Sequence, residues 1–242
     1  MFIIRLVFLC LWLLISCVLG TIFCVFRWGN PSNNSIFARV FAIPATKICS
    51  IRVAIYGREH LLANQPCIYV ASHQSAVDLA TYGLLFPTKT LVIGKKELKW
   101  IPGFGLYFMA SGNIMIDRKN RRKAVAGLGE AVNAARDKGL SIWIFPEGTR
   151  NVSGEGLLPF KRGAFHTAIA AGIPIVPLVQ SPFVNLISWK NKVLGGGSVE
   201  IRILPPISTA GMTSADVEKL SNLTRSKMLE ALPGLTTRLD HP

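Results

Sequence analysis

The chain has 242 residues, half of them hydrophobic, and a formal net charge of +14 from 27 Lys and Arg against 13 Asp and Glu. This length suits one sizeable domain with an appendage. An apolar, basic chain favours an anionic partner, which leaves nucleic acid, a phosphorylated substrate and an acidic membrane surface as candidates. The five cysteines lack paired or metal-ligand spacing, so the sequence predicts neither a disulfide framework nor a metal site.

An uncharged apolar run occupies the amino end, from Leu6 to Phe26 between Arg5 and Arg27. Its length is close to the roughly 20 residues that a helix needs to cross the hydrocarbon core. A secretory signal is the alternative, but its apolar region is usually only about 7 to 15 residues long. We therefore expect a retained transmembrane helix. The cations that follow it favour a globular part in the cytoplasm, by the positive-inside rule.

A turn-rich break at residues 28–35 follows this run, and residues 36–50 then mix apolar side chains with Arg39 and Lys47. The pattern predicts an interfacial helix, interrupted at Pro44, whose cations reach lipid phosphates. We therefore divide the chain into a membrane anchor with an interfacial helix, residues 1–50, and a globular domain, residues 51–242.

From about Ile51 onward, short apolar runs of strand type alternate with longer helical patterns. The strand-type runs lie at residues 68–71, 91–94, 113–116, 141–145, 173–179 and 199–204, and the helical patterns at residues 75–85, 122–138, 165–171 and 214–232. We expect Val125, Val132 and Leu223 on the apolar faces of their helices. The alternation predicts an α/β fold with a mixed, largely parallel sheet flanked by helices.

His73 and Asp78 stand five residues apart, just after the apolar run that ends at Ala71. His73 is expected at the carboxyl end of a strand, where open α/β sheets usually place ligand sites. A strand-to-helix turn can bring Asp78 to the imidazole, so that the pair makes a general base. Taken alone, the spacing favours the simpler interpretation of a loop histidine and a helix-capping aspartate.

Three basic turns lie beside predicted strand or helix ends, at residues 112–123, 144–151 and 159–163. Backbone N–H groups and guanidinium groups in such turns can bind an anion. Each turn alone is typical of a solvated basic surface. Together, in a membrane-anchored chain, they indicate a phosphate-bearing substrate at the bilayer surface. The candidate residues are Arg118, Glu147, Gly148, Thr149, Arg150 and Lys161.

Four sequence blocks point to a known family. They are HQSAVD from His73, GNIMIDR from Gly112, FPEGTR from Phe145 and IPIVP from Ile173. In this order they resemble the four motif blocks of the glycerolipid acyltransferases. The resemblance covers about residues 50 to 205, and it is greatest to the bacterial members that acylate lysophosphatidic acid. Asn151 departs from the pattern, since many relatives have Ser there.

The resemblance implies transfer of an acyl chain to the free hydroxyl of 1-acyl-sn-glycerol-3-phosphate (lysophosphatidic acid), forming phosphatidic acid. The donor would be an acyl thioester, either acyl-CoA or acyl carrier protein, and no further cofactor is implied. His73, oriented by Asp78, would be the general base. The membrane phospholipids around the anchor would be its partners, in a bacterial inner membrane with the catalytic domain facing the cytoplasm.

The resemblance also gives the basic turns a role. Arg118 and Arg150 would bind the acceptor phosphate, and Lys161 would be an outer cation. Glu147 and Gly148 would shape the acceptor pocket.

Two alternatives stay open, namely an acyltransferase acting on another lyso-lipid and a non-catalytic, membrane-anchored protein that binds anionic lipid. A serine hydrolase is disfavoured because the chain has no Gly-x-Ser-x-Gly elbow. Nucleic acid is disfavoured as a partner because of the apolar anchor.

Overall fold

The computed structural model describes residues 1–183 and 186–239, apart from the side chain of Arg121. The strands are β1 (Ile51–Tyr56), β2 (Ile68–Ala71), β3 (Thr90–Lys95), β4 (Ile114–Ile116), β5 (Ser141–Ile144), β6 (Ile175–Gln180), β7 (Ile187–Ser188), β8 (Val193–Leu194), β9 (Gly197–Ile203) and β10 (Arg238–Leu239). Within this part of the chain, eight of them form one sheet in the order β1-β9-β6-β2-β5-β3-β4, with β10 beside β9. β9 runs antiparallel to β6 and β10, and the other pairs of this sheet are parallel.

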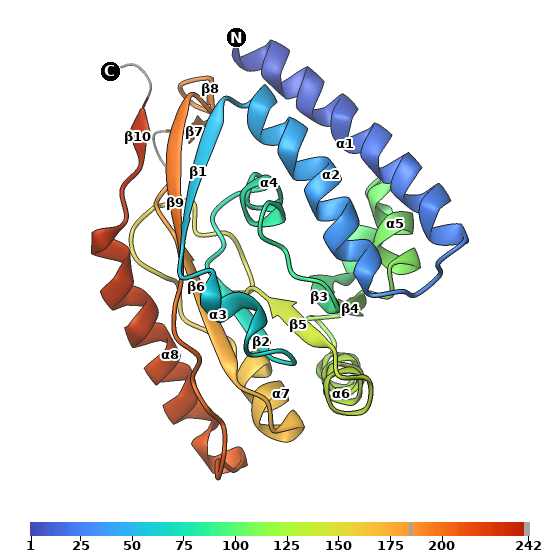
Figure 1. The fold of residues 1–242 in the computed structure, drawn as a ribbon, viewed down its shortest axis with the longest axis vertical. Helices are drawn as coiled ribbons and strands as arrows, with labels where there is room; N and C mark the ends of the chain where they lie inside the picture. The colour runs from blue at the N-terminus through green and yellow to red at the C-terminus, as the bar shows by residue number, and fades with distance from the viewer. Residues whose placement is uncertain (184–185, 240–242) are drawn as a thin grey trace.

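Helices cover both faces of the sheet (Figure 1). They are α1 (Phe2–Val25), α2 (Ser32–Ile48), α3 (Glu59–Leu62), α4 (Asp78–Gly83), α5 (Phe104–Ala110), α6 (Arg121–Lys138), α7 (Gly163–Ala171) and α8 (Val217–Ala231), with 3-10 turns at Lys96–Trp100, Ser214–Asp216 and Leu232–Gly234. α2 and α4 pack on one face, and α6, α7 and α8 pack on the other. α1 lies outside α2 and α5 (Figure 1). The predicted α/β fold with a mixed, largely parallel sheet is confirmed.

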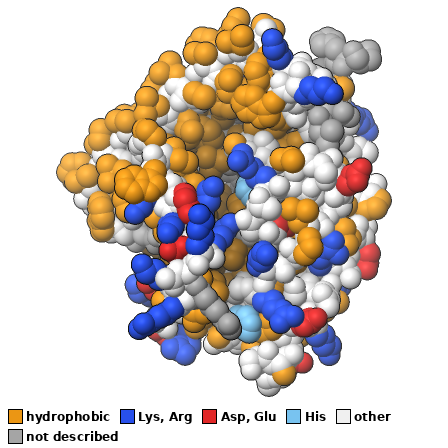
Figure 2. Space-filling model, turned by 180° about the vertical axis from the view of Figure 1, so that it is seen from behind, with side chains coloured by type: hydrophobic (Ala, Val, Ile, Leu, Met, Phe, Trp, Pro, Cys, Tyr) orange, Lys and Arg blue, Asp and Glu red, His pale blue; other side chains and the backbone are white. Residues whose placement is uncertain are grey.

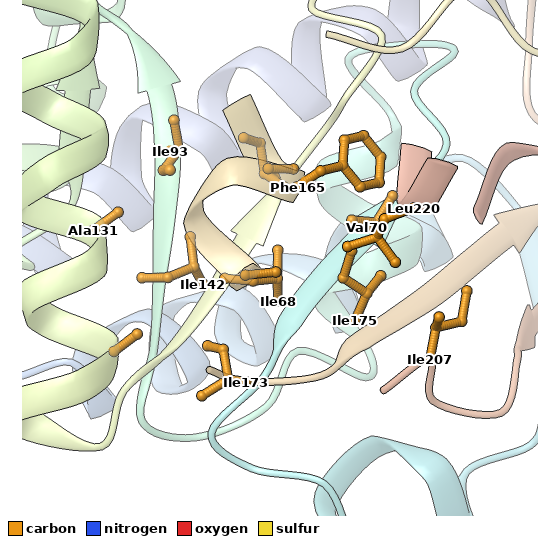
Figure 3. Close-up of a cluster of buried hydrophobic side chains, with 14 of the residues drawn as sticks. Ile68, Val70, Ile93, Ala131, Ile142, Phe165, Ile173, Ile175, Ile207 and Leu220 are labelled. Carbon is orange, nitrogen blue, oxygen red and sulfur yellow. The ribbon is translucent and has the colours of Figure 1, made fainter. Parts of the chain in front are cut away.

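The central strands are buried on both faces, which explains their continuous apolar runs. Ile68 and Val70 of β2 point into the cluster beneath α6, α7 and α8, together with Ile142 and Ile175 of the neighbouring strands (Figure 3). Tyr69, between them in sequence, is buried on the opposite face. Successive side chains of a strand point to opposite faces, so one short run supplies both cores.

The parallel strands also bring the sequence blocks that begin at His73 and Phe145 to the same end of the sheet. β2 pairs with β5 through Val70 and Ile144, and with β6 through Ala71 and Leu178. Because the three strands are parallel neighbours, their carboxyl ends lie side by side at the same end of the sheet. The segments that begin at Ser72, Phe145 and Ser181 meet there.

Two predicted helix boundaries were wrong. α2 is not interrupted at Pro44 but continues to Ile48. Proline inside a helix costs about 3 kcal/mol, and here the helix is retained because its neighbours Phe41 and Ala45 are buried against the rest of the molecule. α4 begins at Asp78, not at Ser75, because the Asp78 carboxylate accepts the Ser75 N–H and holds the preceding residues in a turn.

The predicted helix faces also need correction. Val125 is 61% exposed and Val132 is half-buried, whereas α6 packs on the sheet through small residues such as Ala131. Small residues allow close approach, and a Cβ on Gly127 would lie only 3.2 Å from Ile116. Leu223 of α8 is likewise exposed.

α1 is long and apolar enough to cross a membrane, and it is also attached to the domain along its length. Cys17 and Cys24 are buried on its inner side, Trp12 donates to the Phe41 carbonyl at 3.1 Å, and Arg5 donates to the Leu194 carbonyl at 2.8 Å. α1 and α2 share a hydrophobic cluster with residues of β1 and β9. The division of the chain at residue 50 stays a prediction.

Candidate active site

His73 and Asp78 form a hydrogen-bonded pair between the end of β2 and the start of α4. His73 Nδ1 lies 2.6 Å from Asp78 Oδ2. The same oxygen accepts the backbone N–H groups of Gln74 at 2.7 Å and Ser75 at 3.1 Å. Asp78 is only 1% exposed. An acceptor fixed in this way favours the tautomer with the proton on Nδ1, so that Nε2 is free to take a proton.

The imidazole is held flat against an aromatic ring. Its centroid lies 4.2 Å from that of Phe145, with an interplanar angle of 19°. The His73 side chain remains 24% exposed, and within the described residues no side chain or backbone group is hydrogen-bonded to Nε2. A fixed imidazole with an accessible nitrogen is the arrangement that a general base requires.

Glu147 ties the site together from the loop after β5. Its Oε1 accepts the His73 N–H and its Oε2 accepts the Leu158 N–H, both at 2.9 Å. The side chain is buried, and this burial raises the pKa of the Glu147 carboxyl. Glu147 therefore fixes backbone segments instead of facing an anion with its charge, and its contribution to an acceptor pocket stays a prediction.

Two of the predicted cations lie together beside Gly148. Arg118 donates through Nη1 to the Gly148 carbonyl. A Cβ on Gly148 would lie 3.4 Å from Lys161 Cγ and 3.9 Å from Arg118 Nη1. Gly148 has a φ of +72°, a conformation that glycine adopts at little cost. The turn therefore depends on glycine both for its backbone shape and for the space that the two cations occupy.

Thr149 and Arg150 are exposed at the outer end of the same turn. Neither forms a hydrogen bond or ion pair with another described residue, so the structure leaves the Arg150 guanidinium available. Asn151, the departure from the family pattern, is buried, and its backbone N–H donates to the His73 carbonyl at 2.7 Å. Its side chain bonds the carbonyls of Glu155 and Gly156 at 3.1 and 3.2 Å.

The sequence analysis missed three polar residues at the site. Lys96 Nζ lies 2.7 Å from Asp117 Oδ2, next to Arg118. Gln74 donates to the Gln180 carbonyl at 3.0 Å, and Gln180 Nε2 in turn donates to Asp78 Oδ1 at 3.3 Å. Gln74 stands inside the HQSAVD block, which was the one available signal. The positions of Lys96 and Gln180 depend on strand order, which the spacing of residues does not give.

The face opposite the viewer of Figure 1 has a hollow lined by hydrophobic side chains, with several Lys and Arg side chains gathered below it (Figure 2). An apolar hollow beside cations suits a ligand that is part lipid and part anion. Among the described residues, no three His, Cys, Asp or Glu side chains are grouped as metal ligands would be. The expectation that no metal takes part stays a prediction.

Fold and site together define an α/β protein with a His–Asp pair beside cations and a first helix that could span a membrane. Comparison with known proteins assigns its family. Residues 52–181 match the family model described as Acyltransferase. The chain is 37% identical to the 1-acyl-sn-glycerol-3-phosphate acyltransferase of Escherichia coli (strain K12), over 97% of this chain and 94% of that protein. The protein therefore belongs to the acyltransferase family, which confirms the resemblance.

Other relatives agree. The enzyme of the same name from Haemophilus influenzae is 40% identical over 86% of this chain and 85% of its own length. The human protein named 1-acyl-sn-glycerol-3-phosphate acyltransferase alpha is 36% identical over 93% and 79%, respectively. The fold is that of the crystal structure of the 1-acyl-sn-glycerophosphate (LPA) acyltransferase PlsC from Thermotoga maritima, with a TM-score of 0.74, 24% identity and 97% of both chains covered.

Proposed function

We propose that this protein transfers an acyl chain from an acyl thioester to the free hydroxyl of 1-acyl-sn-glycerol-3-phosphate, forming phosphatidic acid. The observation that carries the proposal is the His73–Asp78 pair, with Nδ1 and Oδ2 2.6 Å apart and Nε2 accessible. The names of the relatives, which cover most of this chain, support the choice of acceptor. Acyl-CoA and acyl carrier protein are the two donors that fit this chemistry.

In the proposed mechanism, His73 Nε2 takes the proton of the acceptor hydroxyl as the hydroxyl oxygen attacks the thioester carbonyl. Asp78 stabilises the imidazolium that forms. The new C–O bond then replaces the C–S bond, and the imidazolium returns its proton to the departing sulfur. Because a thiol has a pKa of about 8.5, the sulfur is a good leaving group and needs no acid stronger than the imidazolium. The acyl group passes directly from donor to acceptor, so no residue has to carry it.

The acceptor phosphate would lie beside the turn at Gly148. Arg118 and Lys161 meet there, and the exposed Arg150 would close over the phosphate from the outer end of the turn. Bonds from a guanidinium to a phosphate are charge-assisted and stronger than neutral hydrogen bonds. The Lys96–Asp117 pair would hold the segment that presents Arg118.

The membrane would supply the acceptor. The outer side chains of α1 and those of α2, such as Val40 and Ile43, are apolar and exposed, so a bilayer can cover them. We place the protein at a bacterial inner membrane with the active site on the cytoplasmic side, in contact with membrane phospholipids. The cations that follow α1 and the bacterial relatives support this placement.

The test is an acylation assay with the full chain in detergent or vesicles. Both donors are combined with lysophosphatidic acid and with a panel of other lyso-lipids, and the products are separated. We expect phosphatidic acid from lysophosphatidic acid, and none from the His73→Ala variant. A preference for another lyso-lipid would change the acceptor, and lipid binding without turnover would favour the non-catalytic alternative.

A further inference from the structure

Gln180 ends β6 next to the loop that carries the His–Asp pair. The residue has no exposed surface. Its backbone N–H donates to Ser72 Oγ at 3.2 Å, and its carbonyl accepts Gln74 Nε2 at 3.0 Å. Both partners flank His73 in the sequence. The Gln180 backbone is therefore hydrogen-bonded to the residues that precede and follow His73, the proposed base.

The side-chain amide of Gln180 bonds the second oxygen of Asp78. Gln180 Nε2 donates to Asp78 Oδ1 at 3.3 Å, whereas His73 and the two backbone N–H groups all use Oδ2. Among the described residues, Gln180 is the only donor to Oδ1. Without it, one oxygen of a buried carboxylate would lack a partner, and only the bonds to Oδ2 would resist rotation of the carboxylate plane.

The contact with Asp78 determines which way the amide is oriented. Gln180 Oε1 is buried and has no hydrogen-bond partner among the described residues. A flipped amide would place this oxygen against Asp78 Oδ1, two acceptors facing each other. Gln180 also lines a cavity of about 250 Å³ whose other walls include Leu157, Leu229 and Leu232. The Gln180 side chain nevertheless has no water-accessible surface, so a carboxyl group at position 180 would be buried against Asp78.

We propose that Gln180 is a positioning residue that holds the Asp78 carboxylate in the plane in which it orients His73. This inference rests on the proposed function, since it assigns a role within the His73–Asp78 pair. The other titratable groups near the pair are Glu147, from the loop after β5, and Tyr82 of α4, whose hydroxyl lies 3.0 Å from Ser72 Oγ. They are unchanged in the variants below, so their titration is common to all the profiles compared.

The experiment measures turnover against pH for the full chain with saturating donor and acceptor. Gln180→Glu places a second carboxyl group beside the buried Asp78, and burial together with the neighbouring negative charge favours the protonated form of the added group. While this added carboxyl is protonated it can donate to Asp78 Oδ1, and turnover should stay near that of wild type. As the pH rises and it ionises, the donor is lost and two like charges face each other, so turnover relative to wild type should fall about tenfold. Gln180→Met keeps the approximate volume but removes the donor, and its turnover should fall about tenfold, as for a lost hydrogen bond to a charged group, with little change in either KM.

The control is Gln65→Glu, the same substitution before the opposite end of β2, where Gln65 Nε2 donates to the Thr88 carbonyl. It should leave the pH profile unchanged. If Gln180→Glu and Gln180→Met lower thermal stability but keep the wild-type pH profile and turnover, Gln180 is only structural and the inference is overturned. An active His73→Ala variant would instead overturn the proposed function, so the two failures are distinguishable.

Discussion

The Glu147 carboxylate accepts the backbone N–H of His73 at 2.9 Å, and so joins the loop after β5 to the loop that carries the proposed base. Its second oxygen accepts the Leu158 N–H. Glu147→Gln supplies one acceptor where two are needed and turns an NH₂ group toward an N–H. We expect the free energy of unfolding to fall by about 1 to 3 kcal/mol, measured by denaturant titration, with a parallel loss of turnover. Unchanged stability would contradict this role.

The Glu147 carboxyl also gives a pH dependence with a definite sign. Burial raises its pKa in the folded state above the ordinary value of 4.5, so the folded protein binds this proton more tightly than the unfolded chain. The stability that comes from this proton is fully present below pH 4.5 and is lost as pH rises through the folded pKa. The stability difference between wild type and Glu147→Gln should therefore be larger at pH 4.5 than at pH 7. A difference that grows with pH would refute this sign.

The His73–Asp78 pair predicts two distinct losses. His73→Ala should abolish acyl transfer. Asp78→Asn removes the acceptor that sets the imidazole tautomer, and turnover should fall by roughly 10³ to 10⁴ in a protein whose circular dichroism shows it to be folded. Near-normal turnover of His73→Ala would exclude the mechanism. If Asp78→Asn lost all turnover because the protein unfolded, Asp78 would have a structural role only.

The two arginines should affect the acceptor more than the donor. Arg118→Ala and Arg150→Ala each remove a charge-assisted bond worth about 1.5 to 3 kcal/mol, so the acceptor KM should rise at least about tenfold while the donor KM changes little. Arg136→Ala on α6, where Arg136 pairs with Asp137 at the surface, is the matched control. Equal effects on both KM values would show that the arginines are structural.

We expect the outer face of α1 to attach the protein to the membrane but not to contribute to packing within the protein. Val7 and Val18 are exposed, so Val7→Asp with Val18→Asp should leave thermal stability unchanged in detergent. Each aspartate costs up to about 3 kcal/mol in the hydrocarbon region, and sedimentation should show the variant released from anionic vesicles at a salt concentration that leaves wild type bound. If the variant bound vesicles as tightly as wild type does, the outer face of α1 would not be in contact with the membrane.

Deleting residues 1–26 gives a different result, because the inner face of α1 covers part of the core. Phe37 and Tyr107 stack at 3.8 Å between ring centroids beneath it. The truncated chain should lose thermal stability as well as membrane attachment. It should still bind anionic vesicles through α2 at low salt, and this binding should decrease as salt rises, since salt screens the attraction of Arg39 and Lys47 to lipid. Wild-type stability after truncation would show that α1 does not pack as described.

The sequence by itself determined the alternation of the central strands and helices, and it predicted the His–Asp pair. The glycines at 139 and 172 end α6 and α7 in the left-handed conformation, which is a common way for a helix to end. His73 and Asp78 were identified from spacing and from the family resemblance. These features are local, since they depend on residues within one turn or one short run, and local sequence can specify them.

Tertiary structure decided the features that depend on distant neighbours. α2 continues through Pro44 because Phe41 and Ala45 are buried, which a single segment does not reveal. Glu147 looked like part of an anion-binding turn, yet it bonds the backbone of a loop that precedes it by 74 positions. Gln180 reaches Asp78 across 102 positions. Contacts of this kind follow from strand order and from the burial of polar groups, which must find partners wherever the folded chain supplies them.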